Sequence, residues 1–346
     1  ITSQRLFLPI FCLALVLLVN IITTPNFFSI EIRDGVLYGY MIDIINRASE
    51  LVILAVGMTL VVSSSAGTDI SVGAIMAVSA AVCCNILTGG ERAVTAYANP
   101  LILGFIAALV VGAAIGCFNG FLVSKLNIQP MVATLIMFTA GRGIAQLITD
   151  GQITYVRVDS YRVLGASFPG FPVPTPFIVA VLVVALTSLL LKKTALGMYI
   201  QSVGINKRAS QLVGIKSVLI IFLTYAYCGL CSGLAGLIAS SRIYSADANN
   251  IGLNLEMDAI LAVALGGNAL GGGKFSLMGS VIGAYTIQAL TTVLYGLNVS
   301  ADQLPVYKAV VVIIIVVIQS PVFRRSVDEW KKKRALKNNK AMEGGH

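Results

Sequence analysis

The stretch Leu60–Met76, LVVSSSAGTDISVGAIM, decides the fold, because it places polar residues and a carboxylate inside an apolar run. Four serines, a threonine, a glycine and Asp69 fall within residues 63–71. If the run crosses a membrane, an ionised carboxylate at the bilayer centre costs about 2.5–3.5 kcal/mol. Non-helical backbone at that depth is tolerated only against protein or a water-filled cavity. The stretch therefore predicts a break in a membrane-spanning element.

The composition of the chain supports a membrane protein. Of 346 residues, 57% are hydrophobic and 11% are charged, whereas a soluble domain is about 25% charged. So many apolar side chains cannot be buried in one soluble core. We expect an all-α polytopic membrane protein, because helices satisfy their own backbone hydrogen bonds in lipid.

Ten apolar segments follow one another along the chain. A spanning helix needs about 20 residues, and at least about 17. Two segments are shorter, 51–64 and 258–271, and each leads into a polar or glycine-rich break. We expect about ten transmembrane helices, or eight if the two short segments are re-entrant. The segments are 6–22, 51–64, 71–88, 100–123, 131–148, 176–191, 217–240, 258–271, 276–297 and 305–320.

The two short segments resemble each other. LAVGMTLVVSSSAGTD begins at Leu54 and LAVALGGNALGGGK begins at Leu261. Interrupted segments in corresponding positions predict two pseudo-repeated halves with a transport site at the breaks. Simple glycine-mediated packing is the alternative interpretation. Segment 39–49, GYMIDIINRAS, is amphipathic and predicts an interfacial helix on the outer side.

Lysines and arginines predict the orientation. The loop 192–216 carries five of them and no acid, and the tail 324–340 carries eight. The positive-inside rule places both in the cytoplasm, together with the N-terminus. The loops 23–50, 149–175, 241–257 and 298–304 are then outside. We expect a permease domain over 1–323 and a basic cytoplasmic tail over 324–346, whose last residues EGGH resemble a tag remnant.

The sequence carries no motif of soluble enzymes. Its one histidine is the last residue, and no Cys/His spacing suits a metal. GNALGGGKFS fails as a phosphate-binding loop, because Asn268 and Phe275 stand where Gly and Ser/Thr are required. We expect no catalysis, no metal and no cofactor in this chain, and no nucleic-acid partner.

Two intramembrane charges are candidates for a transport path. Asp69-Ile70-Ser71 has the form of a helix start, so Asp69 either caps the helix 71–88 or lines a cavity. Arg142 lies between two glycines, and Gln146 follows four residues later on the same helical face. The alternative is that Arg142 extends its guanidinium towards the outer surface.

The loop GINKRASQLVG, 204–214, is the third candidate. It is short and amphipathic, its small residues are bracketed by glycines, and it lies between two spans. We expect it to dock into a groove on another protein, unless it is an ordinary positively charged loop.

Four blocks of the sequence resemble the ribose-type sugar permeases of ATP-binding-cassette importers. In GMTLVVSSSAGTDISVGAIMAVS, Asp69, Ser71 and Gly73 match the family signature, and Ala66 and Thr68 depart from it. The other blocks are CFNGFLVSKLNIQPMVATLI, VGINKRASQLVGI and LEMDAILAVALGGNALGGGK. The resemblance extends over about 51–320, and within the family it is greatest to the galactofuranose subgroup.

The resemblance implies a permease subunit in the bacterial inner membrane that imports a monosaccharide such as galactofuranose, ribose, xylose or galactose. It implies a second permease subunit as homodimer or heterodimer partner, a cytoplasmic ATPase that binds ATP and Mg, and a periplasmic sugar-binding protein, all amid membrane lipid. The residues expected on the substrate path are Asp69, Ser71, Asn119, Thr134, Arg142 and Gln146. Those expected to couple to the ATPase are Gly204, Asn206, Arg208, Ala209 and Gly214. Those expected to dock the binding protein are Asp247, Asn249, Asn250 and Glu256.

Other transport classes remain open at this point. An ion- or proton-coupled secondary transporter also has broken helices, although it would be expected to carry more titratable residues. A branched-chain amino-acid permease shares the importer architecture. A channel is a weaker alternative, because no segment resembles a selectivity filter.

Overall fold

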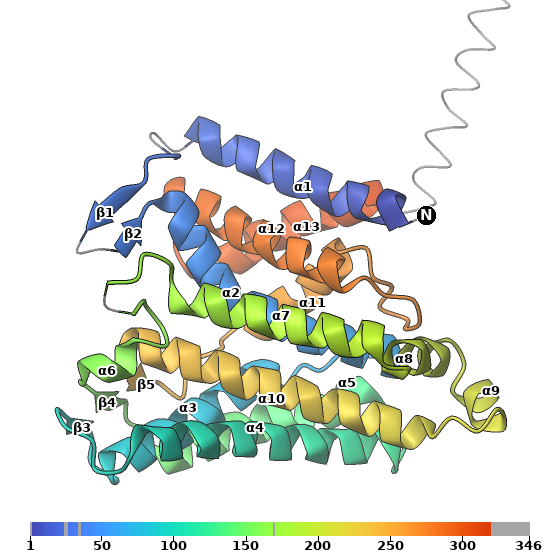
Figure 1. Cartoon of the computed structure of the whole chain (residues 1–346), viewed down its shortest axis with the longest axis horizontal. Helices are drawn as coiled ribbons and strands as arrows, with labels where there is room; N and C mark the ends of the chain where they lie inside the picture. The colour runs from blue at the N-terminus through green and yellow to red at the C-terminus, as the bar shows by residue number, and fades with distance from the viewer. Residues whose placement is uncertain (1, 24–26, 34–35, 169, 320–346) are drawn as a thin grey trace, which may run out of the picture.

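The computed structural model describes residues 2–23, 27–33, 36–168 and 170–319. In Figure 1 most of the long helices run across the view. The short strands and α6 gather at the left, whereas α8, α9 and the start of α1 lie at the right. We call these the strand end and the α9 end. The predicted tail, 324–346, lies outside the described residues.

Each of the ten apolar segments contains a helix. They are α1 (Thr2–Thr23), α2 (Tyr40–Ser65), α3 (Val72–Thr88), α4 (Leu101–Ser124), α5 (Pro130–Ile148), α7 (Thr175–Lys193), α10 (Ser217–Ile243), α11 (Leu255–Leu265), α12 (Leu277–Gly296) and α13 (Leu304–Gln319). Three further short helices are α6 (Asp159–Arg162), α8 (Leu196–Ile205) and α9 (Lys207–Leu212). Among the described residues, six helices are long and apolar enough to cross a membrane by themselves: α2, α4, α5, α7, α10 and α12.

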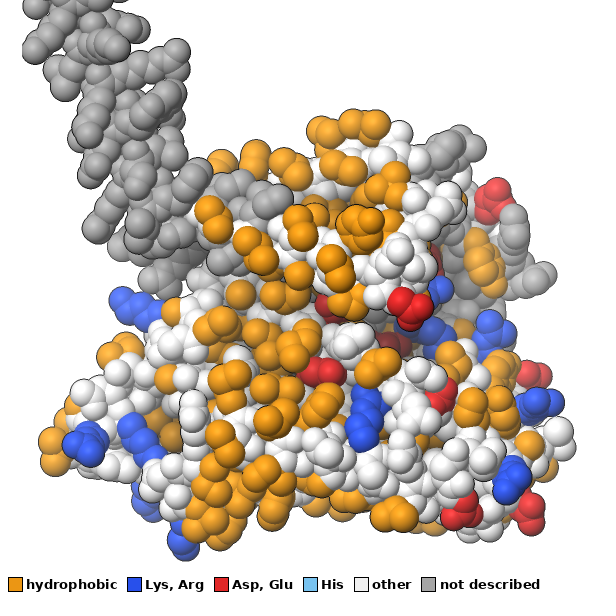
Figure 2. Space-filling model, turned by 180° about the vertical axis from the view of Figure 1, so that it is seen from behind, with side chains coloured by type: hydrophobic (Ala, Val, Ile, Leu, Met, Phe, Trp, Pro, Cys, Tyr) orange, Lys and Arg blue, Asp and Glu red, His pale blue; other side chains and the backbone are white. Residues whose placement is uncertain are grey.

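The surface carries many apolar side chains. Figure 2 shows orange side chains spread over the helices, with blue and red ones fewer and scattered. Leu147 is 79% exposed, and α4 and α7 expose most of their apolar length. A lipid environment accounts for this exposure, because hydrocarbon chains are as apolar as these side chains.

Two small sheets lie at the strand end, and the all-α expectation did not include them. β1 (Glu31–Arg33) pairs antiparallel with β2 (Val36–Tyr38). β4 (Thr154–Val156) pairs parallel with β3 (Ala93–Val94) and antiparallel with β5 (Ser245–Ala246). The second sheet ties three loops together that are far apart in the sequence.

The prediction of a separate interfacial helix over 39–49 is wrong. These residues form the first turns of α2, a single helix of 26 residues whose apolar window is 94% buried. Its charges are paired: Arg47 bonds Asp43 at 2.9 Å, and Glu50 bonds Arg242 of α10 at 3.0 Å. Because these charges are paired, the charged first half of α2 can continue into its buried second half. Segment 51–64 is therefore part of a full-length span.

The centre of the bundle is held by close helix contacts. Gly112 and Gly116 of α4 face Gly229 of α10. A Cβ added at Gly112 would lie 2.7 Å from the Gly229 carbonyl oxygen, and one added at Gly116 would lie 2.9 Å from the Gly229 Cα. Small residues at such seams let two backbones approach closely in a membrane. α4 and α10 therefore pack as a unit with no side chain between them at these positions.

The two predicted breaks lie against each other. α2 ends at Ala66, which has a left-handed φ of 53°, and α3 starts again at Val72. α11 has 11 residues, or about 16 Å of helix, half the thickness of the hydrocarbon core. The loop 266–276 follows it, and there the Gly273 amide donates to the Ser63 carbonyl at 2.9 Å. At each break the chain therefore reverses its direction at the α9 end.

Candidate functional site

The α2–α3 break is supported by an internal hydrogen-bond network around Asp69. Its Oδ1 accepts from the Ser71 amide at 2.9 Å and from the Ser71 hydroxyl at 2.6 Å. The Asn119 amide of α4 donates to Ser71 Oγ at 2.8 Å. Thr134 Oγ1 of α5 accepts from the Ile70 amide at 3.2 Å. These bonds join α3, α4 and α5 at the point where the chain leaves helical geometry.

This network is sealed. Asp69, Ser71, Asn119 and Thr134 are each 0% exposed. The accessible path expected along these four side chains is therefore not seen in this structure, and Asp69 accepts from the turn that precedes α3, as the capping interpretation expects. The physical reason is that the freed backbone amides of residues 70 and 71 need acceptors, and Thr134 of α5 and Asp69 itself supply them without water.

A second polar cluster lies on an accessible face of α5. Thr139, Arg142 and Gln146 recur at helical spacing, so they share one side of the helix. Thr139 and Gln146 are exposed and Arg142 is half-buried. An added Cβ at Gly143 would meet open space. This face is the part of the predicted path that the structure leaves open.

Arg142 holds the segment that precedes α11. Its Nη1 donates to the carbonyl oxygens of Ala248 at 3.0 Å and Ile251 at 2.6 Å. Residues 247–254 are not α-helical, so carbonyls such as those of Ala248 and Ile251 need donors from elsewhere in the bundle. We call 247–254 the dipping segment, because it leads from β5 at the strand end to a contact with the start of α3.

The dipping segment also meets Gln146. The Gln146 side-chain amide donates to Asn249 Oδ1 at 2.6 Å. Asp247 Oδ1 accepts from the amides of Asn249 at 3.0 Å and Asn250 at 3.2 Å, which fixes a turn. The sequence assigned Gln146 to the path and Asn249 to partner docking, and the structure brings the two side chains together.

Glu256 does not belong to the exposed set. It is 2% exposed, at the first turn of α11, so the expectation that it lies on the outer surface is wrong. A Cβ added at Gly73 would come within 2.2 Å of Glu256 Oε2 and 2.3 Å of the Gly252 carbonyl. Only glycine fits at position 73, because the dipping segment and the half-helix press directly on the start of α3.

The 204–214 segment lies at the α9 end, apart from both clusters. Asn206 Oδ1 accepts from the Ala209 amide at 2.9 Å, a side-chain cap on α9. Arg208 and Ala209 are exposed, and Gly214 has a φ of +87°. α9 therefore projects a short amphipathic surface away from the bundle.

Gly204 connects this surface to the two breaks. A Cβ there would come within 1.7 Å of the Ser63 carbonyl and 2.6 Å of the Gly273 amide. The end of α8, the end of α2 and the loop 266–276 thus meet backbone to backbone. We call this contact the glycine junction.

Two largely buried ion pairs were not foreseen from the sequence. Glu50 pairs with Arg242, and Lys308 of α13 pairs with Asp258 of α11 at 2.7 Å. The partners of each pair belong to segments far apart in the sequence, so spacing gives no signal for them. Within the described residues no group of three or more His, Cys, Asp or Glu side chains could hold a metal.

Comparison with known proteins gives the family. The family described as "Branched-chain amino acid transport system / permease component" matches residues 40–319, which include every element of both polar clusters and α9. The chain belongs to this permease family. The family description names amino-acid transport, whereas the three relatives described next are named for sugars.

Three relatives match along nearly their whole length. The chain is 46% identical to the galactofuranose transporter permease protein YtfT of Escherichia coli K12, over 90% of this chain and 88% of the relative. It is 43% identical to the fructose import permease protein FruF of Bifidobacterium longum, over 88% and 84%. It is 36% identical to the ribose import permease protein RbsC of Escherichia coli K12, over 89% and 92%. The resemblance to sugar permeases, greatest to the galactofuranose subgroup, is confirmed.

No solved structure matches the chain. The positions of the two polar clusters in this chain therefore rest on the geometry described above.

Proposed function

We propose that the chain is the permease subunit of an ATP-binding-cassette importer, and that it carries a monosaccharide along the exposed face of α5. The observation that carries the path is the accessible cluster of Thr139, Arg142, Gln146 and Asn249. It offers hydroxyl, amide and guanidinium groups, whose donors and acceptors suit neutral sugar hydroxyls. No carboxylate among the described residues of this cluster opens to the face.

The sugar is a galactofuranose-like monosaccharide. Relatives at 46% and 43% identity are named for galactofuranose and fructose, and one at 36% is named for ribose. All three cargoes are small and neutral, which agrees with a face that offers hydroxyl, amide and guanidinium groups and no carboxylate among its described residues. Of these three relatives, the one with the highest sequence identity to this chain is named for galactofuranose, which favours that sugar.

The partners are a second permease subunit, a cytoplasmic ATPase that binds ATP and Mg, and a periplasmic sugar-binding protein. α9 projects at the end rich in lysine and arginine, which suits cytoplasmic docking. Asp247, Asn249 and Asn250 lie towards the strand end, on the opposite side, where a binding protein would deliver sugar. The same charge asymmetry supports cytoplasmic termini, and membership of the permease family supports the bacterial inner membrane.

Reconstituted uptake tests the function. The chain, its candidate ATPase and binding protein are placed in vesicles with internal ATP, and uptake of labelled galactofuranose, ribose, fructose and leucine is compared. We expect ATP-dependent sugar uptake and no leucine uptake. Leucine uptake would instead assign the chain to amino-acid import, and dependence on a proton gradient at constant ATP would assign a secondary transporter.

Ala209→Trp tests the coupling surface. Ala209 is exposed, so the larger side chain leaves the bundle unchanged while it blocks a docking groove. We expect normal yield, weakened ATPase binding and loss of uptake. The matched control is Met198→Trp, which changes a 67%-exposed residue of the preceding helix α8. Full uptake by Ala209→Trp would reject α9 as the coupling element.

A further inference from the structure

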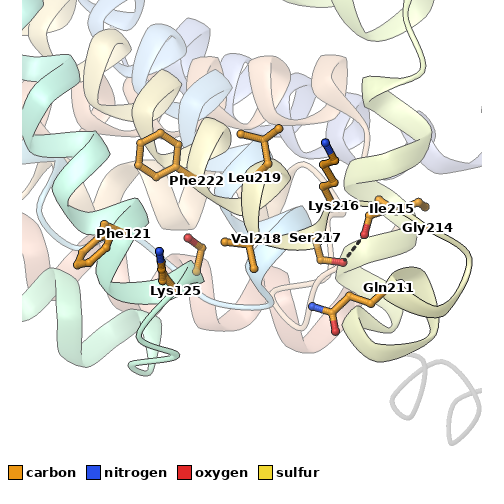
Figure 3. Close-up of a pocket in the computed structure, with 11 residues that line it drawn as sticks. Phe121, Lys125, Gln211, Gly214, Ile215, Lys216, Ser217, Val218, Leu219 and Phe222 are labelled. Carbon is orange, nitrogen blue, oxygen red and sulfur yellow. Dashed lines mark hydrogen bonds between the residues drawn. The ribbon is translucent and has the colours of Figure 1, made fainter.

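A large open cavity lies at the α9 end, between α4 and α10 and away from the α5 face. It has a volume of ≈ 730 Å³. Figure 3 shows Phe121 and Lys125 on α4 on one side and Val218, Leu219 and Phe222 on α10 on the other. The lining residues are Phe121, Ser124, Lys125, Gln211, Gly214, Ile215, Lys216, Ser217, Val218, Leu219 and Phe222.

The cavity combines an apolar wall with a cationic rim. Phe121 is 42% exposed, Val218 40% and Leu219 47%, so its wall faces the surroundings of the bundle. Lys125 and Lys216 are both exposed beside this wall. This is the arrangement of a membrane–water interface, where the stems of long cations lie along apolar surface and their heads reach the boundary.

The charges around the cavity favour a ligand with an anionic group. Three segments at the α9 end, 121–130, 192–219 and 266–276, surround the cavity or lie beside it, and they contain no Asp or Glu. Seven cations stand there without a carboxylate: Lys125, Lys192, Lys193, Lys207, Arg208, Lys216 and Lys274. An anionic group at the cavity would face no repulsion from these segments.

The cavity also offers hydrogen-bond donors that lack partners. Ser124 is 1% exposed and its Oγ has no hydrogen-bond partner, although it lines the cavity. α10 begins at Ser217, and in the part of the chain that the structure describes the Val218 and Leu219 amides have no acceptor. The start of a helix of 27 residues favours an anion through these amides and the helix dipole.

A second, mostly apolar cavity lies further along α10 and shares no lining residue with the first. Its volume is ≈ 370 Å³, and its wall comes mainly from α7, α8 and α10, including Leu223, Ala226 and Leu230 of α10. Residues 219, 223, 226 and 230 share one helical face. An apolar chain can therefore run from the cationic rim towards the middle of the bundle without leaving contact with α10.

We propose that this cavity binds one anionic phospholipid. The phosphate lies between Lys125 and Lys216, beside Ser124 and the start of α10, and an acyl chain follows the apolar face of α10. A soluble anion would use the donors but not the apolar wall, and a docking protein would not follow the apolar face of α10 along the span. The lipid matches both features.

The experiment measures lipid binding to the full chain, purified in a neutral detergent, by native mass spectrometry. Dioleoylphosphatidylglycerol is titrated against dioleoylphosphatidylcholine. We expect one saturable site with at least tenfold preference for the anionic lipid. Lys125→Gln/Lys216→Gln should remove that preference, and the matched control Lys192→Gln/Lys193→Gln should retain it. Thermal unfolding of each variant verifies that the fold is kept.

Three results would overturn the proposal. Equal affinity for the two lipids in the unaltered chain would show that no anion site exists. Equal losses in both lysine pairs would show a diffuse surface attraction. Displacement of the lipid by millimolar inorganic phosphate, or loss of ATPase binding by the Lys125/Lys216 variant with lipid binding unchanged, would assign the cavity to a soluble anion or to the ATPase.

Discussion

The α2–α3 break and the dipping segment are both irregular backbone within the bundle, but they differ in access. At the break, Asp69 and its partners are fully buried, and the freed amides of Ile70 and Ser71 donate to Thr134 of α5 and to Asp69 itself. In the dipping segment, Arg142 satisfies the carbonyls while Asn249 stays exposed. The two regions touch at Gly73 and Gly252. One region is sealed and supports the fold, and the other exposes polar groups at the surface of the bundle.

The largest expected effect is on folding, at the break. Asp69→Leu removes the acceptor of the Ser71 amide and hydroxyl, both buried. Each stranded donor costs about 1–3 kcal/mol. We expect a large loss of folded protein, measured as monodisperse yield after gel filtration in detergent.

Asp69→Asn is the matched control for that change. It keeps an acceptor of the same shape, so the cap persists. We expect folded yield and uptake per folded molecule close to the unaltered chain. A strong loss of uptake with normal yield would mean that the carboxylate acts on the substrate, and the contrast between the two regions would fail.

The next largest effect is on transport, at Arg142. Arg142→Met releases the carbonyls of Ala248 and Ile251. A hydrogen bond to a charged donor contributes about 1.5–3 kcal/mol, and each 1.4 kcal/mol is about tenfold in an equilibrium. We expect uptake to fall at least tenfold while most protein still folds. Arg142→Lys should recover part of it; normal uptake by Arg142→Met would remove Arg142 from the path.

A smaller effect is expected at Gln146. Gln146→Ala deletes one neutral hydrogen-bonding group and its contact with Asn249, which is a loss of about 1 kcal/mol. We expect the KM for sugar to rise several-fold with yield unchanged. Leu147→Ala, at an adjacent residue that is 79% exposed, is the control and should leave KM unaltered. A similar KM change in both variants would contradict a polar path on this face.

The smallest effect is expected at Asp247. Asp247→Ala removes the acceptor of the Asn249 and Asn250 amides in a turn that is partly open to solvent. We expect a loss of up to about 1 kcal/mol of local order and a modest decrease in ATPase stimulation by the binding protein. Crosslinks from position 250 that reach lipid alone would place this turn outside the docking surface.

The sequence predicted the helices well because hydropathy acts along the whole length of a span. All ten segments contain a helix, and the short α11 and both breaks were expected. The error at 39–49 arose because Asp43 and Arg47 made the start of α2 look interfacial. These two charges pair with each other, and the next charge along α2, Glu50, pairs with Arg242 in a tertiary contact. The strands, with two or three residues each, leave no periodic signal.

The sequence was less informative about which polar residues are accessible. It identified Asp69 and Arg142 as intramembrane charges, but it could not distinguish the sealed one from the open one. That difference depends on Asn119 and Thr134, which reach the break from other helices. The sequence misplaced Glu256 for the same reason. Its side chain is buried by a tertiary contact with Gly73 of α3, and the sequence gives no signal for that contact.

The glycine junction has a mechanical consequence. At Gly204, Ser63 and Gly273 the backbones of three segments are in contact with no side chain to act as a cushion. A displacement of α8 at this contact would press directly on the end of α2 and on the loop that follows α11. A side chain at position 204 would hold these segments apart, because its Cβ would lie 1.7 Å from the Ser63 carbonyl oxygen.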